Sequence, residues 1–120
     1  MNFIDGQPIF IQIAERLSDE ILAGIYLADS RVPGVRDYSV LLEVNVNTTV
    51  KAYDLLAQRG VLYSKRGLGY FVSQGGRERI LELRKEVFLR DELPEFFRQL
   101  EMLDIPLSDV EKMYQDYLQK

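Results

Sequence analysis

The chain has no cysteine, no histidine and no tryptophan, and only four prolines in 120 residues. Without cysteine there is no disulfide, no thiolate zinc site and no cysteine nucleophile. Without histidine the chain lacks the commonest general base and the commonest metal ligand. Acidic residues are plentiful, but no pair of them stands in a context that would shift a pKa. We therefore expect no enzyme, no catalytic residues, no metal site and no cofactor.

Long hydrophobic runs are missing as well. No apolar run approaches the ~18 residues that suggest a membrane span, and the N-terminal MNFIDGQPIFIQ lacks the charged-then-apolar pattern of a signal peptide. We therefore expect a cytoplasmic protein. Hydrophobic residues make up 47% and charged residues 28% of the chain, which is the balance of a globular protein with one domain, or one small domain and an appendage.

Positive charge is concentrated in the middle of the chain. The totals are 15 basic and 19 acidic residues, and taken alone this acidic balance argues against nucleic acid. Residues 1–30 carry one base and five acids, residues 31–76 carry six bases and three acids, and residues 77–120 carry eight bases and eleven acids. A local basic face in residues 31–76 can bind phosphates even on an acidic chain.

Apolar periodicity predicts three helices in the first half of the chain. The first spans residues 8–23, with Pro8 at its first position and Gly24 as its end. Its predicted buried stripe is Ile9, Ile13, Leu17 and Ile21. After an extended connector, a short helix is expected over residues 34–42, and a third runs from the N-cap Asn45 to Gln58.

Only two or three residues separate the second helix from the third, a spacing that is typical of helix-turn-helix units. The pattern then alternates over residues 61–64 and 70–73, which predicts two strands around a glycine-bearing tip at residues 65–69. The predicted fold class is mainly α with a small β-hairpin (α+β). A winged helix-turn-helix occupies residues 1–75, and a helical tail occupies residues 76–120.

The third helix has two different faces. Thr49, Ala52, Tyr53 and Leu56 fall on one side and are expected to pack on the first helix. The outward side mixes amides, a cation and valines, which suits a helix lying in a DNA major groove. The candidate DNA-contacting residues of this helix are Asn45, Val46, Asn47, Thr48, Val50 and Lys51. A solvated helix face has the same polarity and is the alternative.

Further basic candidates lie outside this helix. Arg36 stands in the first turn of the second helix, where the helix dipole disfavours a cation, so a phosphate or a guanine edge is the simplest reason for it. An ion pair with Asp37 or Glu43 is the alternative. Lys65, Arg66 and Gly67 form the hairpin tip, which can reach the minor groove or the DNA backbone. The alternative is a hairpin made soluble by its charges.

The tail is predicted to be helical over residues 77–103 and again over residues 109–118, where Ser108 and Glu111 match a capping box. Pro94 either kinks the first of these helices or starts a new one at residues 91–92. The tail is too short for a core of its own, so a second copy of the chain is its expected partner. The candidate dimerisation residues are Ile80, Leu83, Val87, Phe88, Phe96, Phe97 and Leu100. Packing back onto the first helix, which would give a monomer, is the alternative.

Residues 8–73 resemble the GntR family of transcriptional regulators. The matching segments are PIFIQIA at residues 8–14, AG at 23–24, RVPGVR at 31–36, VNVNTTVKAY at 44–53, RGVL at 59–62 and RGLGYFV at 66–72. The short helical tail is similar to that of the YtrA-type branch, which lacks the large effector domains of other members. The resemblance implies a homodimeric, sequence-specific, bacterial-type transcription regulator, more often a repressor, and control by a small-molecule effector.

The resemblance also implies residue roles. Arg36 corresponds to the family's second-helix DNA arginine, and Gly67 to its wing-tip glycine. Val46 and Val50 depart from the family pattern, which often has arginine at both positions, and Gly34 stands where serine is usual. These departures predict a different target sequence, with thymine methyl groups under the two valines.

Two questions remain open from the sequence. The acidic balance and the two valines also fit a winged-helix module that binds proteins and has lost or weakened its DNA affinity. An effector pocket between the tail helices would lie near Phe88, Phe97 and Tyr114, although such aromatic residues more commonly form a core.

Overall fold

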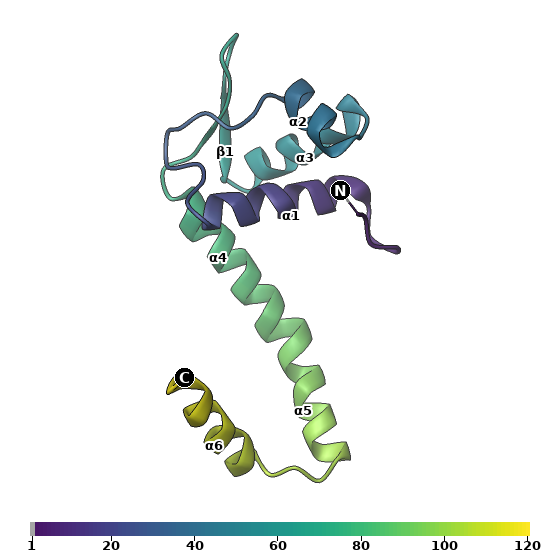
Figure 1. Cartoon of the computed structure of the whole chain (residues 1–120), viewed down its shortest axis with the longest axis vertical. Helices are drawn as coiled ribbons and strands as arrows, with labels where there is room; N and C mark the ends of the chain where they lie inside the picture. Colours follow the sequence, from purple (N-terminus) through teal and green to yellow (C-terminus); the bar gives the residue numbers. More distant parts are fainter. Residues whose placement is uncertain (1) are drawn as a thin grey trace. The chain divides into compact units, whose positions relative to one another are not determined.

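The computed structural model describes residues 2–120. Its helices and strands are, in order, α1 (Ile9–Leu22), α2 (Val35–Leu42), α3 (Val46–Gln58), β1 (Leu62–Lys65), β2 (Gly69–Val72), α4 (Gly76–Val87), the π-helical turn η1 (Phe88–Glu92), α5 (Leu93–Met102) and α6 (Leu107–Leu118) (Figure 1). The chain divides into two compact units, one ending at Glu82 and the other spanning Leu83–Lys120. The predicted fold class, a winged helix-turn-helix with a helical tail, is confirmed.

The first unit has a core built between α1, α2 and α3. The predicted inward residues of α3 are all buried. They meet Ile13, Leu17 and Ile21 of α1, which are also buried, so these three positions of the predicted stripe are confirmed. Between α2 and α3, Ser39 Oγ lies 2.7 Å from Thr49 Oγ1, which satisfies two buried hydroxyl groups.

The first turn of α1 differs from the prediction. Pro8 is the N-cap residue rather than the first helical residue, and Ile9 is 44% exposed rather than buried. At this end the core is covered by Phe3 and Phe10 instead. The side chain of Gln12, itself buried, accepts a hydrogen bond from Ile4 N and donates one to Ile4 O, which holds the N-terminal segment against α1.

The turn between α2 and α3 brings the two helices together as predicted. Asn45 is the N-cap of α3, and its side-chain oxygen accepts a hydrogen bond from the backbone N–H of Asn47 at 2.8 Å. Glu43 ends α2 in the left-handed conformation, with φ +58°. This turn fixes α3 directly after α2, as a helix-turn-helix requires.

Strands β1 and β2 form an antiparallel hairpin in which Leu62 pairs with Val72 and Lys65 with Gly69. The segment before α2 lies along the other side of β2. Val32 N donates to Tyr70 O, Val72 N donates to Ser30 O, and Arg31 forms an isolated bridge with Phe71. The wing is therefore held on both sides of β2, by β1 and by the connector.

The start of α4 belongs to the first unit. Gly76 begins the helix where a Cβ would lie only 2.8 Å from Val61 O and 3.3 Å from Val72 Cγ1, so the close approach requires glycine. Ile80, predicted to lie in a dimer contact, is only 3% exposed and packs into the core of the first unit. This is a correction: Ile80 is not available to a second copy of the chain, because the first part of α4 belongs to the first unit, which ends at Glu82.

The tail continues helically through η1, which answers the question posed by Pro94. The π-helical turn widens the helix immediately before Pro94, which occupies the first turn of α5. A proline ring clashes with the carbonyl group four residues earlier and cannot donate a backbone hydrogen bond. Before the proline, Leu93 N donates to Phe88 O five residues earlier, so the chain passes through a π-helical turn without ending the helix.

The last helix begins earlier than predicted. α6 starts at Leu107, with Pro106 as N-cap and no side-chain cap hydrogen bond, so Ser108 lies inside the helix and the predicted capping box is wrong. The extended ψ of 146° at Pro106 lets the helix start at the next residue, and Asp109 N then donates to Pro106 O. No helix among residues 2–120 is long and apolar enough to cross a membrane.

Candidate nucleic-acid interface

The outer face of α3 presents polar and apolar groups side by side. Asn45, Asn47 and Lys51 are exposed, Val46 is 39% exposed, and Thr48 and Val50 are half-buried. The opposite face is fully packed, and Tyr53 at its centre donates a hydrogen bond from its hydroxyl group to Pro33 O at 2.6 Å. The packed face anchors the helix, so the outer face is rigidly presented.

Arg36 is exposed in the first turn of α2. The part of the chain that the structure describes contains no ion pair between Arg36 and either Asp37 or Glu43. The guanidinium group is therefore open to solvent and can donate to a phosphate or to a guanine edge.

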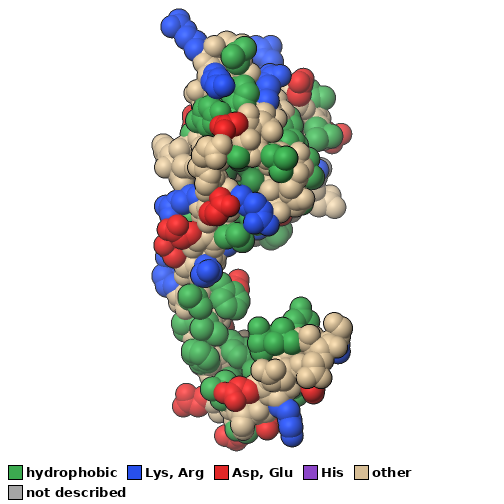
Figure 2. Space-filling view, turned by 90° about the vertical axis from the view of Figure 1, so that its left-hand side faces the viewer, with side chains coloured by type: hydrophobic (Ala, Val, Ile, Leu, Met, Phe, Trp, Pro, Cys, Tyr) green, Lys and Arg blue, Asp and Glu red, His purple; other side chains and the backbone are tan. Residues whose placement is uncertain are grey.

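The wing tip carries the second group of cations. Lys65 ends β1, Arg66 and Gly67 lie in the turn, and all three are exposed. Gly67 has φ +78°, a left-handed conformation that glycine adopts without strain. Lys and Arg side chains gather at this end of the first unit, at the top of Figure 2. The electrostatic surface at the tip suits a phosphate backbone.

Hydrogen bonds hold the wing at its base and against α3. Those donated to Asp29 by Gln74 and by the Tyr63 hydroxyl group lower the pKa of the Asp29 carboxyl group. Burial, followed by the nearby Asp54 carboxylate, raises the pKa of Tyr70. The tyrosine hydroxyl groups therefore stay protonated at neutral pH and act as donors.

Two aromatic residues that the sequence did not single out lie against candidate DNA lysines. Lys51 Nζ lies 4.4 Å from the centroid of the Phe10 ring, and Lys65 Nζ lies 4.7 Å from that of Phe71. Phe10 belongs to α1 and is distant from Lys51 in the sequence, so periodicity gave no signal for this contact. The second contact follows from the strand register, in which Phe71 pairs with Tyr63.

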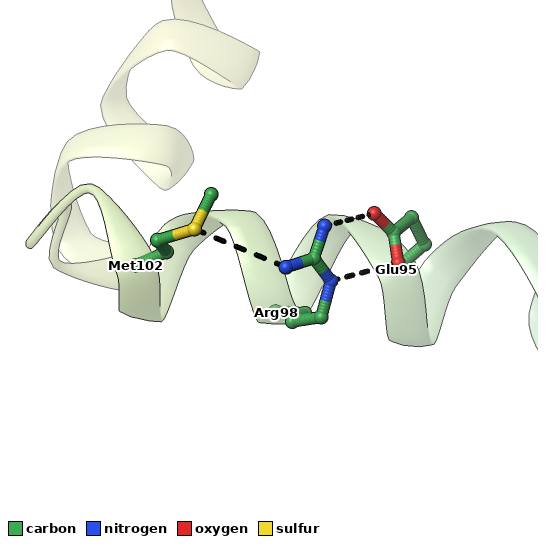
Figure 3. Close-up of polar contacts among 3 residues, drawn as sticks. All are labelled: Glu95, Arg98 and Met102. Carbon is green, nitrogen blue, oxygen red and sulfur yellow. Dashed lines mark hydrogen bonds and ion pairs between the residues drawn. The ribbon is translucent and has the colours of Figure 1, made fainter.

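The tail has a different character, because its helices are amphipathic. On α5, Arg98 donates hydrogen bonds to both carboxylate oxygens of Glu95, at 3.0 and 2.6 Å, and lies 3.9 Å from Met102 Sδ (Figure 3). These residues mark the polar side of α5, and helical spacing sets Phe96, Phe97 and Leu100 on the opposite side. Phe96 is 41% and Phe97 is 50% exposed.

No residue from Leu83 to Lys120 is buried. The apolar stripe of α6 is equally open, with Leu107, Tyr114, Tyr117 and Leu118 all more than half exposed. Green side chains run along α5 and along the side of α6 that faces it in Figure 2. The aromatic residues suggested for an effector pocket, Phe88, Phe97 and Tyr114, are 49, 50 and 56% exposed. In a single chain all three side chains are therefore open to solvent.

Comparison with known proteins identifies the family of this chain. Residues 11–72, just over half of the chain, match the family described as bacterial regulatory proteins, gntR family. The chain belongs to the GntR family. It is a transcription regulator with a winged-helix DNA-binding domain, and it is not an enzyme.

Two Bacillus subtilis regulators are similar in sequence to this GntR protein. It is 26% identical to the HTH-type transcriptional regulator YhcF over 109 residues, which cover 91% of this chain and 88% of YhcF. It is 31% identical to the HTH-type transcriptional repressor YtrA over 75 residues, which cover 62% of this chain and 58% of YtrA. The resemblance to the YtrA-type branch is thereby confirmed, and the match to YhcF extends into the tail.

Solved structures agree with this assignment. A GntR-family regulator from Bacteroides thetaiotaomicron is 45% identical and superimposes with a TM-score of 0.82, covering 92% of this chain and 96% of its own. The DNA-binding domain of AraR, solved in complex with the operator ORR3, is 30% identical with a TM-score of 0.56, covering 61% of this chain and 88% of its own. The first superposition includes the tail. The second covers a share of the chain no larger than the winged domain.

Proposed function

We propose that this GntR protein is a homodimeric transcriptional repressor that binds a two-fold symmetric operator in the cytoplasm. The observation that carries the proposal has two parts. The outer face of α3 is open while its inner face is packed in the core, and no residue of the second unit, Leu83–Lys120, is buried. The first supplies base and phosphate contacts, and the second needs a partner. The similarity to the repressor YtrA supports repression, and the similarity to AraR, solved in complex with an operator, supports operator binding.

The DNA contacts follow from the chemistry of each exposed group. An asparagine amide can pair with the N6/N7 edge of adenine, which suits Asn47 at the start of α3. Val46 and Val50 can touch thymine methyl groups, so the half-site is expected to contain thymine at these positions. Lys51 neutralises a phosphate, and Arg36 contacts a phosphate or a guanine edge.

The wing would complete the interface beside the recognition helix. The hairpin tip is narrow at Gly67, and its neighbours Lys65 and Arg66 are cationic. These properties suit contact with the minor groove or with the adjacent phosphates. One domain makes few base contacts in this way, so a dimer that reads two half-sites gains both affinity and specificity.

The tail supports dimerisation by its lack of a core. Its apolar side chains, among them Leu83, Val87, Phe88, Phe97 and Leu100, lie on amphipathic helices that a second copy can cover. Dimer formation would also enclose the aromatic side chains that are exposed in a single chain. A small-molecule effector would accordingly bind between copies and act on the distance between the two winged domains.

The test is selection of DNA duplexes from a random pool by the purified chain, followed by fluorescence anisotropy with the selected duplex and a scrambled one. We expect a two-fold symmetric consensus, preference for the selected duplex, and a binding constant that falls with salt by ~0.9 log unit per log unit for each phosphate contact. Light scattering should give the mass of a dimer. Equal binding of both duplexes, or a salt-independent signal, would favour a protein-binding winged module instead.

Repression itself needs a separate measurement. A reporter gene placed behind the selected duplex should be expressed less when the chain is present. An increase in expression would identify an activator and would overturn this part of the proposal without affecting the DNA contacts.

A further inference from the structure

The recognition-helix lysine lies on an aromatic ring. Lys51 Nζ is 4.4 Å from the centroid of the Phe10 ring, and Phe10 is a partly buried residue of α1 that packs against the core. A cation at this distance over a ring face is attracted by the ring quadrupole. Because the ring is held by the core, the lysine side chain is drawn into one of its many rotamers.

The wing lysine shows the same arrangement on a separate element. Lys65 Nζ is 4.7 Å from the Phe71 centroid and 5.8 Å from that of Tyr63. The two rings stack across the hairpin, with centroids 5.7 Å apart and planes 23° apart. The Tyr63 hydroxyl group also donates to Asp29, which fixes the stack at the base of the wing.

We propose that Phe10 and Phe71 are positioning residues of the DNA interface, which hold the ammonium groups of Lys51 and Lys65 ready for phosphate oxygens. This inference rests on the proposed DNA contacts of the two lysines. Neither ring need touch DNA. Their effect is exerted through the lysines, which are the two candidate cations with the most flexible side chains.

The geometry is compatible with phosphate binding because an ammonium group has three donors. The ring face occupies one side of the group and leaves N–H donors on the other side for phosphate oxygens. A lysine that is already confined loses less rotamer freedom when it binds. The rings therefore raise affinity without adding a charge, and they do not change the number of counterions that the cationic side chains release.

The experiment compares Phe10→Leu with Lys51→Ala, singly and together, by anisotropy with the duplex selected by the wild-type chain. Leucine keeps the apolar packing and removes the ring. We expect Phe10→Leu to weaken DNA binding about two- to fivefold for each copy of the side chain, and by the square of that factor in a dimer. The slope of the logarithm of the binding constant against the logarithm of the salt concentration should not change. Lys51→Ala should weaken binding and lower the salt slope by ~0.9 for each phosphate that the lysine neutralises in the wild type.

The double variant separates positioning from packing. If Phe10 acts through Lys51, Phe10→Leu should have no further effect in the Lys51→Ala background. Phe10→Tyr keeps a ring and should bind as the wild type does. Phe3→Leu is the matched control, because Phe3 is also a partly buried phenylalanine packed on the core, and it should leave binding unchanged. The same cycle with Phe71→Leu and Lys65→Ala tests the wing.

A measurement without DNA tests the contact itself. The ε-methylene protons of Lys51 should show an upfield ring-current shift in the NMR spectrum, which should disappear in Phe10→Leu and remain in Phe3→Leu. Wild-type binding by Phe10→Leu, or an equal loss with and without Lys51, would overturn the inference and leave the proposed function standing. Failure of the wild-type chain to prefer the selected duplex would overturn both.

Discussion

The hydroxyl group of Tyr70, in wing strand β2, donates a hydrogen bond to Asp54 Oδ1 on recognition helix α3 at 3.2 Å. The ring of Tyr70 also meets the buried Tyr53 edge to face, with centroids 5.1 Å apart. These contacts join the two elements that carry the candidate DNA contacts. The wing and the recognition helix are therefore fixed at one separation before DNA is bound.

Removal of the Tyr70 hydroxyl group should weaken DNA binding more than it weakens the fold. Tyr70→Phe keeps the ring against Tyr53 and removes only a solvent-exposed hydrogen bond, so the free energy of unfolding should change by no more than about 1 kcal/mol. Affinity for the selected duplex should fall about two- to fivefold, because the wing must then be ordered on binding.

Tyr26→Phe is the matched control for this change. Tyr26 is half-buried in the same unit, and the structure records no hydrogen bond from its hydroxyl group within residues 2–120. It should bind as the wild type does. Equal anisotropy curves for wild type and Tyr70→Phe would show that the bond to Asp54 has no part in binding.

Alkaline pH should unfold the winged domain through two buried tyrosines. Burial, followed by the hydrogen bond to Glu20, raises the pKa of Tyr38, and burial also raises the pKa of Tyr53. Both stay protonated in the folded state at a pH where the unfolded chain loses these protons. The folded state then binds more protons, so stability is full below pH ~10, the unfolded value, and is lost as pH rises above it.

Thermal melts between pH 8 and pH 11 and the tyrosinate absorbance check this prediction. Of the seven tyrosines, Tyr38 and Tyr53 should titrate only together with unfolding. The melting temperature should fall less steeply with pH in Tyr38→Phe, after allowance for its lower starting stability. A melting temperature that is constant up to pH 11 would contradict the assignment.

Gly76 should not tolerate a side chain. In Gly76→Ala the new Cβ would lie 2.8 Å from the backbone oxygen of Val61, which cannot move aside as a flexible side chain could. We expect a decrease of about 1–3 kcal/mol in the free energy of unfolding, measured in urea. Gly34→Ala is the control, because the nearest atom to its Cβ is 3.8 Å away and its φ is negative, and it should change stability by less than about 1 kcal/mol.

The sequence predicted the parts of the fold that depend on short-range rules. Asn45 caps α3 because its side chain reaches a backbone N–H two residues away, and Thr49 and Tyr53 are buried because helical spacing sets them on one face. One local rule failed, because the capping box predicted at Ser108 does not form. The errors at Ile9 and Ile80 arose where distant segments meet. Ile9 and Ile80 have the same apolar character and spacing as neighbouring residues, but only packing between helices decides which surface each one faces.

The candidate DNA interface also has features that the sequence could predict and features that it could not. The exposed positions of α3 and the positive φ of Gly67 follow from local rules, so both could be predicted. The contact of Lys51 with Phe10 and that of Tyr70 with Asp54 could not, because each joins two elements whose side chains meet only in the folded chain. Both contacts lie between elements rather than within them.

Dimerisation should depend on the apolar side of α5. Phe97 is 50% exposed in the single chain, so Phe97→Glu places a charge on this side without disturbing a core of the chain itself. In a dimer the same charge would be buried without a partner, which is strongly unfavourable. Light scattering should therefore give a monomer, and affinity for the two-fold duplex should fall at least tenfold, while binding to a single half-site is unchanged.

Arg98→Gln is the control for this variant, because both changes lower the net charge by one and both residues lie on α5. Arg98 lies on the polar side of α5, where its pair with Glu95 is exposed and worth little to stability. Arg98→Gln should remain a dimer with wild-type affinity. If Phe97→Glu is also a dimer, this side of α5 is not the dimer contact. If both variants are monomers, the two sides of the helix are not distinguished, and the contact must instead depend on charge.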